Sequence, residues 1–137
     1  MVKAEAEHLG FPSADRPLNY DLDVQPTAHF SPDSHALVVS ADFSLDMEQA
    51  SGIDVDDAET ETRKIASLSF TLVALFDTPA DATYEPDELD SFAGTTGIFS
   101  LYPYAREYVQ DVTGRLGLPP LTLGVYRVSP ASDAEGD

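Results

Sequence analysis

Three segments in the first half of the chain alternate apolar and polar residues with a period of two. They are LNYDLDVQ at residues 18–25, ALVVSADFSLDM at residues 36–47 and KIASLSFTLVALF at residues 64–76. Such alternation predicts β-strands with one face in a core and the other in solvent. The middle segment is the most regular, because one of its faces takes an unbroken apolar set: Leu37, Val39, Ala41, Phe43, Leu45 and Met47.

Polar connections join these strands, and strands of this kind pair as an antiparallel sheet. Residues 30–35, FSPDSH, predict a turn, and the acidic stretch at residues 51–62 predicts a loop. An irregular lead-in is expected before residue 18, with a short edge strand around residues 4–9. On the solvent face of the sheet the alternation sets out four carboxylates, which predict an acidic surface: Asp21, Asp23, Asp42 and Asp46.

A helical pattern begins at Ser100, where apolar residues start to recur at spacings of three and four. Ser100 is expected to cap the helix, and Pro103 is acceptable only in its first turn. Gly117 is expected to end it, since two prolines follow soon after. The residues between the sheet and Ser100 predict a loop, and residues 121–128 predict one more extended segment. The apolar face of the helix comprises Tyr104, Ala105, Tyr108, Val109, Val112 and Leu116.

The chain of 137 residues is expected to form one domain at residues 1–128, followed by a disordered acidic tail at residues 129–137. The net charge of −18 disfavours nucleic acid and anionic membranes as partners, because both would repel the protein. This charge favours solubility or attraction to basic and unfolded segments, and adaptation to high salt would also produce it. The sequence shows neither a signal-peptide pattern nor an apolar run of membrane length, which favours the cytoplasm.

No arrangement of reactive side chains indicates an enzyme or a metal site. The chain has no cysteine, and its three histidines, His8, His29 and His35, lack the spacing of metal ligands. The acidic loop lacks the central glycine and the closing glutamate of an EF-hand, and GTTG at residues 94–97 is too short for a phosphate-binding loop. We therefore expect neither catalysis nor a bound cofactor or metal.

Aromatic residues instead gather in the stretch GIFSLYPYARE, residues 97–107. Tyrosines at helical spacing are usually core or subunit-interface residues, and that interpretation stays open. The alternative is an apolar groove that binds extended peptide. The candidate lining residues of such a groove are Phe92, Ile98, Phe99, Leu101 and Tyr102.

The segment LYPYAREYVQDVTGRLGLPPLTL, residues 101–123, resembles the SecB family of export chaperones. That family opens its long helix with an aromatic residue followed by Pro-Tyr-Ala-Arg-Glu, which matches residues 102–107 here. The order and alternation of the three strands, over residues 18–76, match as well. A glycine, a proline and a Leu-x-Leu segment follow the helix in the family, and the matching residues here are Gly117, Pro119, Leu121 and Leu123.

The resemblance implies an α+β fold, in which a long helix in the C-terminal half packs on an antiparallel sheet of three to four strands. It implies an ATP-independent holdase that binds unfolded polypeptide clients and assembles as a homotetramer, a dimer of dimers. It also implies that the acidic face of the sheet docks the translocase motor SecA.

Within the helix, two sets of residues are expected to have structural roles. We expect Arg106 and Glu107 to make ion pairs that fix a subunit contact or a loop. We expect Tyr104, Tyr108 and Val112 to pack on the sheet or on a partner helix.

The family continues after the Leu-x-Leu segment into a second helix and a zinc-binding tail, for which residues 124–137 are too short and are interrupted by proline. Shortened members of the family occur beside toxin–antitoxin pairs and fold a single antitoxin. A general export chaperone and a chaperone for one dedicated client, such as an antitoxin, are therefore both open. Two other classes of function stay open: an oligomeric adaptor that binds one folded basic partner through the acidic sheet face, and an enzyme with an unrecognised site.

Overall fold

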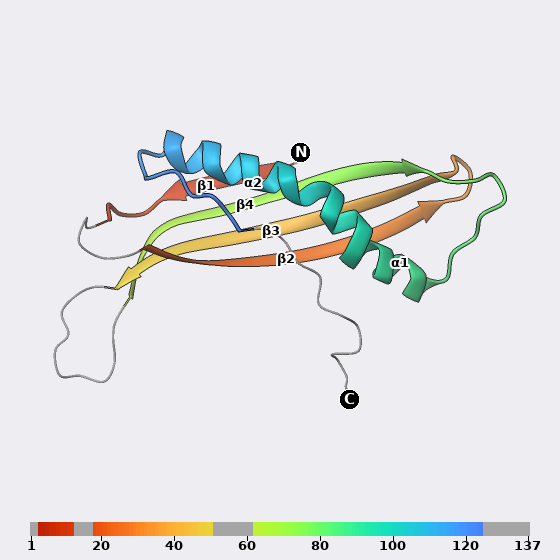
Figure 1. Ribbon diagram of the computed structural model, residues 1–137, viewed down its shortest axis with the longest axis horizontal. Helices are drawn as coiled ribbons and strands as arrows, with labels where there is room; N and C mark the ends of the chain where they lie inside the picture. Colours follow the sequence, from red (N-terminus) through yellow and green to blue (C-terminus); the bar gives the residue numbers. More distant parts are fainter. Residues whose placement is uncertain (1–2, 13–17, 51–61, 125–137) are drawn as a thin grey trace, which may run out of the picture.

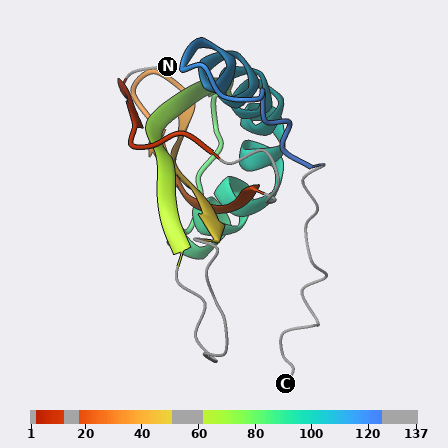
Figure 2. The same ribbon diagram turned by 90° about the vertical axis from the view of Figure 1, so that its left-hand side faces the viewer.

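The structure, a computed structural model, describes residues 3–12, 18–50 and 62–124. Its four strands form one antiparallel sheet in the order β1-β4-β3-β2, and a helical segment lies across one face of that sheet (Figure 1). The end view shows the described helices on this face only (Figure 2). The elements are β1 (Lys3–His8), β2 (Leu18–Ser31), β3 (Ala36–Ala50), β4 (Thr62–Asp77), α1 (Pro86–Phe92), the π-helix η1 (Ala93–Gly97) and α2 (Ile98–Arg115).

The three predicted strands are confirmed, and they are longer than the alternation indicated. β2 continues through Pro26 because it is an edge strand, where a residue without an N–H is tolerated. Leu22 lies opposite Leu45, which lies opposite Leu68, so the apolar faces of β2, β3 and β4 coincide. The expected short edge strand is confirmed as β1, which pairs with β4 and not with β2, its neighbour in sequence.

The centre of the core is an aromatic stack between the sheet and α2. Phe43 of β3 stacks on Phe70 of β4 with ring centroids 4.9 Å apart, and the ring of Tyr108 from α2 lies 4.4 Å from that of Phe70. Both phenylalanine side chains are fully buried. Burying a side chain of this size stabilises a fold by about 1.5–3 kcal/mol, so the stack holds α2 against β4.

The helical segment begins at Pro86, much earlier than the predicted start at Ser100. Proline suits the first helical position, and the Glu88 carboxylate accepts a hydrogen bond of 2.8 Å from the backbone N–H of Glu85. The predicted cap at Ser100 is wrong, because its hydroxyl donates to the carbonyl of Thr96 at 3.0 Å, inside the helix. Pro103 accordingly lies in the helix interior and not in the first turn.

The predicted end of the helix at Gly117 is confirmed. Gly117 has a φ of +86°, a left-handed conformation that favours glycine. The backbone N–H of Leu118 donates to the carbonyl of Thr113 at 3.0 Å, and that of Gly117 donates to Gly114 at 3.1 Å, which is a Schellman motif. The chain then turns back, and Leu118 and Leu123 are buried in the core.

Four predictions fall wholly or partly on residues that the structure does not describe. These are the lead-in at residues 1–2 and 13–17, the acidic loop up to residue 61, the whole tail at residues 129–137 and the second half of the extended segment at residues 121–128. Residues 121–124, which are described, belong to no strand.

Gly97 sets how closely the helical segment approaches the sheet. A Cβ atom at this position would lie 2.8 Å from Cγ1 of Val39 and 3.0 Å from its Cγ2. Val39 is fully buried on β3, so it has little room to move. The stretch AGTTG of η1 contains few good helix formers, and its helical conformation shows that packing on the sheet outweighs local propensity.

Replacing Gly97 by alanine is expected to reduce the free energy of unfolding by about 1–3 kcal/mol, because overpacking a tight core contact costs this much. Gly94 is the matched control, since a Cβ there meets nothing within 4 Å. Alanine in a helix interior is favoured over glycine by up to about 1 kcal/mol. Urea unfolding followed by circular dichroism measures both variants, and equal unfolding midpoints would contradict the close contact at Gly97.

Candidate functional site

A single helical segment covers only part of the inner face of the sheet. α1 packs on β2, whereas α2 packs on β4 and β3, so the segment crosses the strands obliquely (Figure 1). A helix is about 10 Å wide, whereas four strands about 4.8 Å apart extend over about 14 Å before their side chains are counted. Part of the apolar face beside the C-terminal half of β4 is therefore left uncovered.

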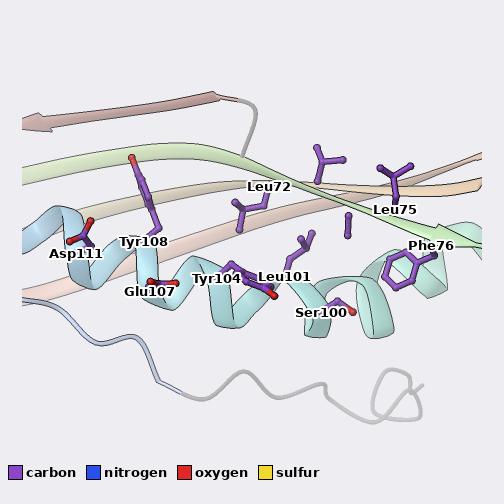
Figure 3. Close-up of a pocket in the computed structure, with 11 residues that line it drawn as sticks. Leu72, Leu75, Phe76, Ser100, Leu101, Tyr104, Glu107, Tyr108 and Asp111 are labelled. Carbon is purple, nitrogen blue, oxygen red and sulfur yellow. The ribbon is translucent and has the colours of Figure 1, made fainter.

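A cavity of about 670 Å³ opens at this place, between β4 and α2 (Figure 3). We call it the β4–α2 cavity. Its volume lies within the range of about 300–1,000 Å³ that is typical of ligand-binding pockets. It is lined by Leu72, Val73, Ala74, Leu75 and Phe76 of β4 and by Ser100, Leu101, Tyr104, Glu107, Tyr108 and Asp111 of α2.

The walls of the cavity are mainly apolar, and several side chains at its opening face solvent. Leu72 and Leu101 are buried, whereas Leu75 is 71% exposed and Tyr104 is 63% exposed. Burial raises the pKa of the Tyr108 phenol above its ordinary value of 10.0, so this side chain stays neutral well above neutral pH. Large exposed apolar side chains beside a concave site are typical of a surface that binds a partner.

Carboxylates form the rim of the cavity on the α2 side. Glu107 and Asp111 lie one helical turn apart, and both line the cavity. Arg115 contacts Asp111 at 3.0 Å, but this pair is exposed and so adds little to stability. Since the whole chain carries a net charge of −18, the rim favours a partner with basic residues.

Of the five predicted groove residues, only Leu101 lines this cavity. Ile98 and Tyr102 are buried in the core, at 0% and 8% exposure, because they face the sheet from α2. Phe92 packs edge-on against Phe76 with centroids 5.1 Å apart, and Phe99 is 49% exposed outside the cavity. Contact of these residues with a bound polypeptide stays a prediction.

The residues predicted to pack on the sheet or to form ion pairs divide between the core and the cavity. Tyr108 and Val112 pack against the core, whereas Tyr104 is exposed and does not pack on the sheet. Among the described residues, Arg106 makes a hydrogen bond in which its Nε donates to the carbonyl of Leu123 at 3.0 Å, and the expected ion pair stays a prediction. This bond fixes the returning C-terminal segment beside α2, and Glu107 lies exposed at the cavity rim.

The strand residues of the cavity were missed because β4 was interpreted as a strand with one polar face. The sequence does indicate that this polar face ends at Thr71, since the polar residues Ser67, Ser69 and Thr71 are followed by Val73 and Leu75 on the same face. Apolar residues on both faces of a strand end indicate that a further element or partner covers it.

The opposite face of the sheet is acidic over one half of its length. Asp21 lies opposite Asp46, which lies opposite Ser67, which lies opposite Glu7. In a second row, Asp23, Ser44, Ser69 and Glu5 face one another in the same way. The acidic face thus extends onto β1, a contribution that was missed because the pairing of this expected edge strand with β4 could not be predicted from the sequence. Asp42 is exposed on the same face and accepts a hydrogen bond of 2.6 Å from the Thr71 hydroxyl.

The described residues offer no assembled site for metal chemistry. Among them, no group of three or more histidine, cysteine, aspartate or glutamate side chains could hold a metal ion. His8, His29 and His35 lie on β1, on β2 and in the turn before β3, apart from one another. In the same ranges, the helices are too short or too polar to span a bilayer.

No family model matches the chain, but known proteins do. SecB-like chaperone Rv1957 of Mycobacterium tuberculosis strain H37Rv is 41% identical over 132 residues, which cover 91% of this chain and 73% of that protein. This chain belongs to the SecB-like chaperone family. The SecB-like chaperone MT2006 of strain CDC 1551 matches with the same identity and coverage.

A solved structure supports the same assignment. It is that of the Mycobacterium tuberculosis SecB-like chaperone Rv1957 in complex with a ChAD peptide from the Rv1956 HigA1 antitoxin. The TM-score is 0.80 at 35% identity, and the match covers 94% of this chain and 87% of that chain. The predicted SecB-like α+β fold and chaperone class are therefore confirmed.

The assignment of core and cavity residues predicts different effects on stability. Ile98→Ala is expected to reduce the free energy of unfolding by about 2–5 kcal/mol, because it leaves a void in the core. Tyr104→Ser is expected to change it by less than about 0.5 kcal/mol, because the side chain is largely in solvent. Chemical unfolding of the two purified variants measures the difference, and a large loss for Tyr104→Ser would show that Tyr104 is a structural residue.

Proposed function

We propose that this protein is an ATP-independent holdase that keeps a dedicated client, such as an antitoxin, from aggregating. The client binds as an unfolded or extended segment in the β4–α2 cavity. Two facts support the proposal: a relative has been solved with an antitoxin peptide, and the cavity here is open, mainly apolar and bordered by exposed apolar side chains. The exposure of Tyr104 and Leu75 beside the cavity is the observation that carries it.

The size of the cavity fits reversible binding without a nucleotide. Two or three apolar client side chains buried there contribute about 1.5–3 kcal/mol each. Micromolar binding requires about 8 kcal/mol after the cost of association is met. Apolar contacts of this number therefore support, on their own, only binding weaker than micromolar, and a client that starts to fold can leave by dissociation alone.

Several finer features belong to the same proposal. We propose a cytoplasmic homotetramer, a dimer of dimers, in which Phe99 of α2 contacts a partner subunit because it is 49% exposed outside the cavity. Tyr104 and Glu107 stay predicted oligomer contacts. Because both residues also line the cavity, a partner subunit that contacts them would compete with the client. The translocase motor SecA is a further predicted partner, through the acidic face at Asp21, Asp23, Asp42 and Asp46.

The acidic face also supports a second candidate function. Rows of carboxylates from β1, β3 and β2 would bind one folded basic protein, and the molecule would then act as an oligomeric adaptor. Such a partner would bind without competing with an unfolded polypeptide, since the rows of carboxylates lie beside Ser67 and Ser69 of β4, whereas residues 72–76 line the cavity.

The holdase proposal predicts that the purified protein, without nucleotide, prevents a chemically denatured client from aggregating on dilution. The double variant Leu75→Ser and Tyr104→Ser should lose most of this activity, because it removes two large apolar side chains from the cavity opening. Tyr20→Ser is the matched control, since Tyr20 is 42% exposed on β2 and does not line the cavity. Light scattering by the client measures the activity, and static light scattering of the protein alone gives its mass.

Three outcomes distinguish the possibilities. Loss of activity at unchanged mass supports client binding in the cavity. Loss of activity together with dissociation assigns Tyr104 to the oligomer interface. Failure of the parent protein to suppress aggregation of any client, including an antitoxin, contradicts the holdase function and favours the adaptor.

A further inference from the structure

β4 is much longer than the strand that covers its outer edge. β1 pairs with β4 from Ala66 to Thr71, and Lys3 lies opposite Thr71 at the end of this ladder (Figure 1). β4 continues to Asp77, and β3 pairs with it along this whole length. Among the described residues, no strand lies beside residues 72–77 of β4 on the side away from β3.

This free edge has none of the features that protect sheet edges from pairing. Backbone N–H and C=O groups on an unpaired edge are a template for another strand, and proteins usually block it with charges, prolines or bulges. Here the edge carries five apolar residues in succession, LVALF at residues 72–76, before the first charge at Asp77. The one register irregularity of β4 lies at the other end of the strand, opposite Met47 and Glu48.

The free edge and the β4–α2 cavity are parts of one surface. The same five residues that form the edge line the cavity. A strand added beside β4 in line with β1 would send alternate side chains toward opposite faces of the sheet. One set would enter the cavity beside Leu101 and Tyr104, and the other would lie beside Val73 and Leu75 on the outer face.

Charge indicates which kind of chain fits. Glu107 and Asp111 on α2 border the cavity, and Asp77 ends the free edge. A second copy of this protein would bring the same carboxylates together, with a net charge of −18 on each molecule. A segment with apolar residues at alternate positions and a neighbouring lysine or arginine meets both the apolar walls and the acidic rim.

We propose that the client is held by β-strand addition to residues 72–77 of β4, as an extended segment of alternating apolar residues flanked by a basic residue. This inference rests on the proposed holdase function and adds the recognition mode. Main-chain hydrogen bonds to β4 supply binding that does not depend on the client sequence, and the cavity selects the alternate apolar side chains.

The inference predicts that removing single backbone N–H groups from the client weakens binding at every second position. The probe is the antitoxin peptide bound by the solved relative, made with one N-methyl group at a time along its length. Methylation of residues whose N–H groups face β4 should weaken binding about tenfold or more. Methylation of the intervening residues should change it less than about threefold. Isothermal titration calorimetry measures each peptide.

The outcomes separate this inference from the function on which it rests. If the unmethylated peptide does not bind and the protein suppresses aggregation of no client, the proposed function fails and the inference fails with it. If the peptide binds and every methylated form binds equally well, the client does bind but strand addition is wrong.

Amide hydrogen exchange of the protein gives an independent readout. Peptide binding should slow exchange in residues 72–77 of β4 and leave the free edge of β2 unchanged. Protection at β2 in place of β4 would overturn the inference. Protection of residues 72–77 that is already present without peptide, and that rises with protein concentration, would assign the edge to a second copy and overturn it as well.

The acidic rim predicts a dependence on salt. The double variant Glu107→Gln and Asp111→Asn should bind a lysine-containing peptide about threefold to tenfold more weakly at low salt, and the difference should shrink at high salt. Asp90→Asn is the control, because Asp90 is an exposed carboxylate of α1 outside the cavity. Equal binding by the rim variant and the control would overturn the role given to a basic client residue.

Discussion

The fold depends on one helical segment covering a sheet that is wider than the segment. The contact between Gly97 and Val39 and the tilted ring contact of Tyr108 with Phe70 bring the helix down at two points along the sheet. Between and beside these points the helix crosses the strands obliquely, from β2 to β4 (Figure 1). The β4–α2 cavity is thus a result of how two elements of unequal width pack, and no inserted loop is needed to form it.

Stability and binding use different residues of the same elements. The core draws on Phe43 and Phe70 and on the face of α2 that includes Ile98, all of which are fully buried. The cavity opening draws on Leu75 and Tyr104, which are mostly in solvent. Apolar side chains can therefore remain available to a partner without weakening the fold, which is the condition that a chaperone of the SecB-like family must meet.

Most of the fold could be predicted from regular patterns of apolar and polar residues, whereas the helix start and the cavity have no such pattern. Strict alternation gave the three long strands, and Gly117 gave the helix end, because each of these depends on local geometry. The helix start was missed because glycines and threonines at residues 94–97 are poor helix formers that packing on Val39 overrides. The cavity could not be predicted, since it depends on where β1 stops along β4 and on the angle of α2, which are properties of tertiary structure. The family resemblance came from residues 101–123 together with the three strands, and Tyr102 of its aromatic-proline block proved to be buried.

The pairing of β1 with β4 also has a consequence for how the molecule is made. β2, β3 and β4 are joined by successive hairpins, whereas β1 must close a loop of about sixty residues to reach its place, an entropic cost that delays such contacts. β1 is therefore expected to join last, and until then the whole outer edge of β4 is open. An open strand edge of this length is the type of surface that favours pairing with other chains, so the order of strand pairing decides for how long this edge is exposed.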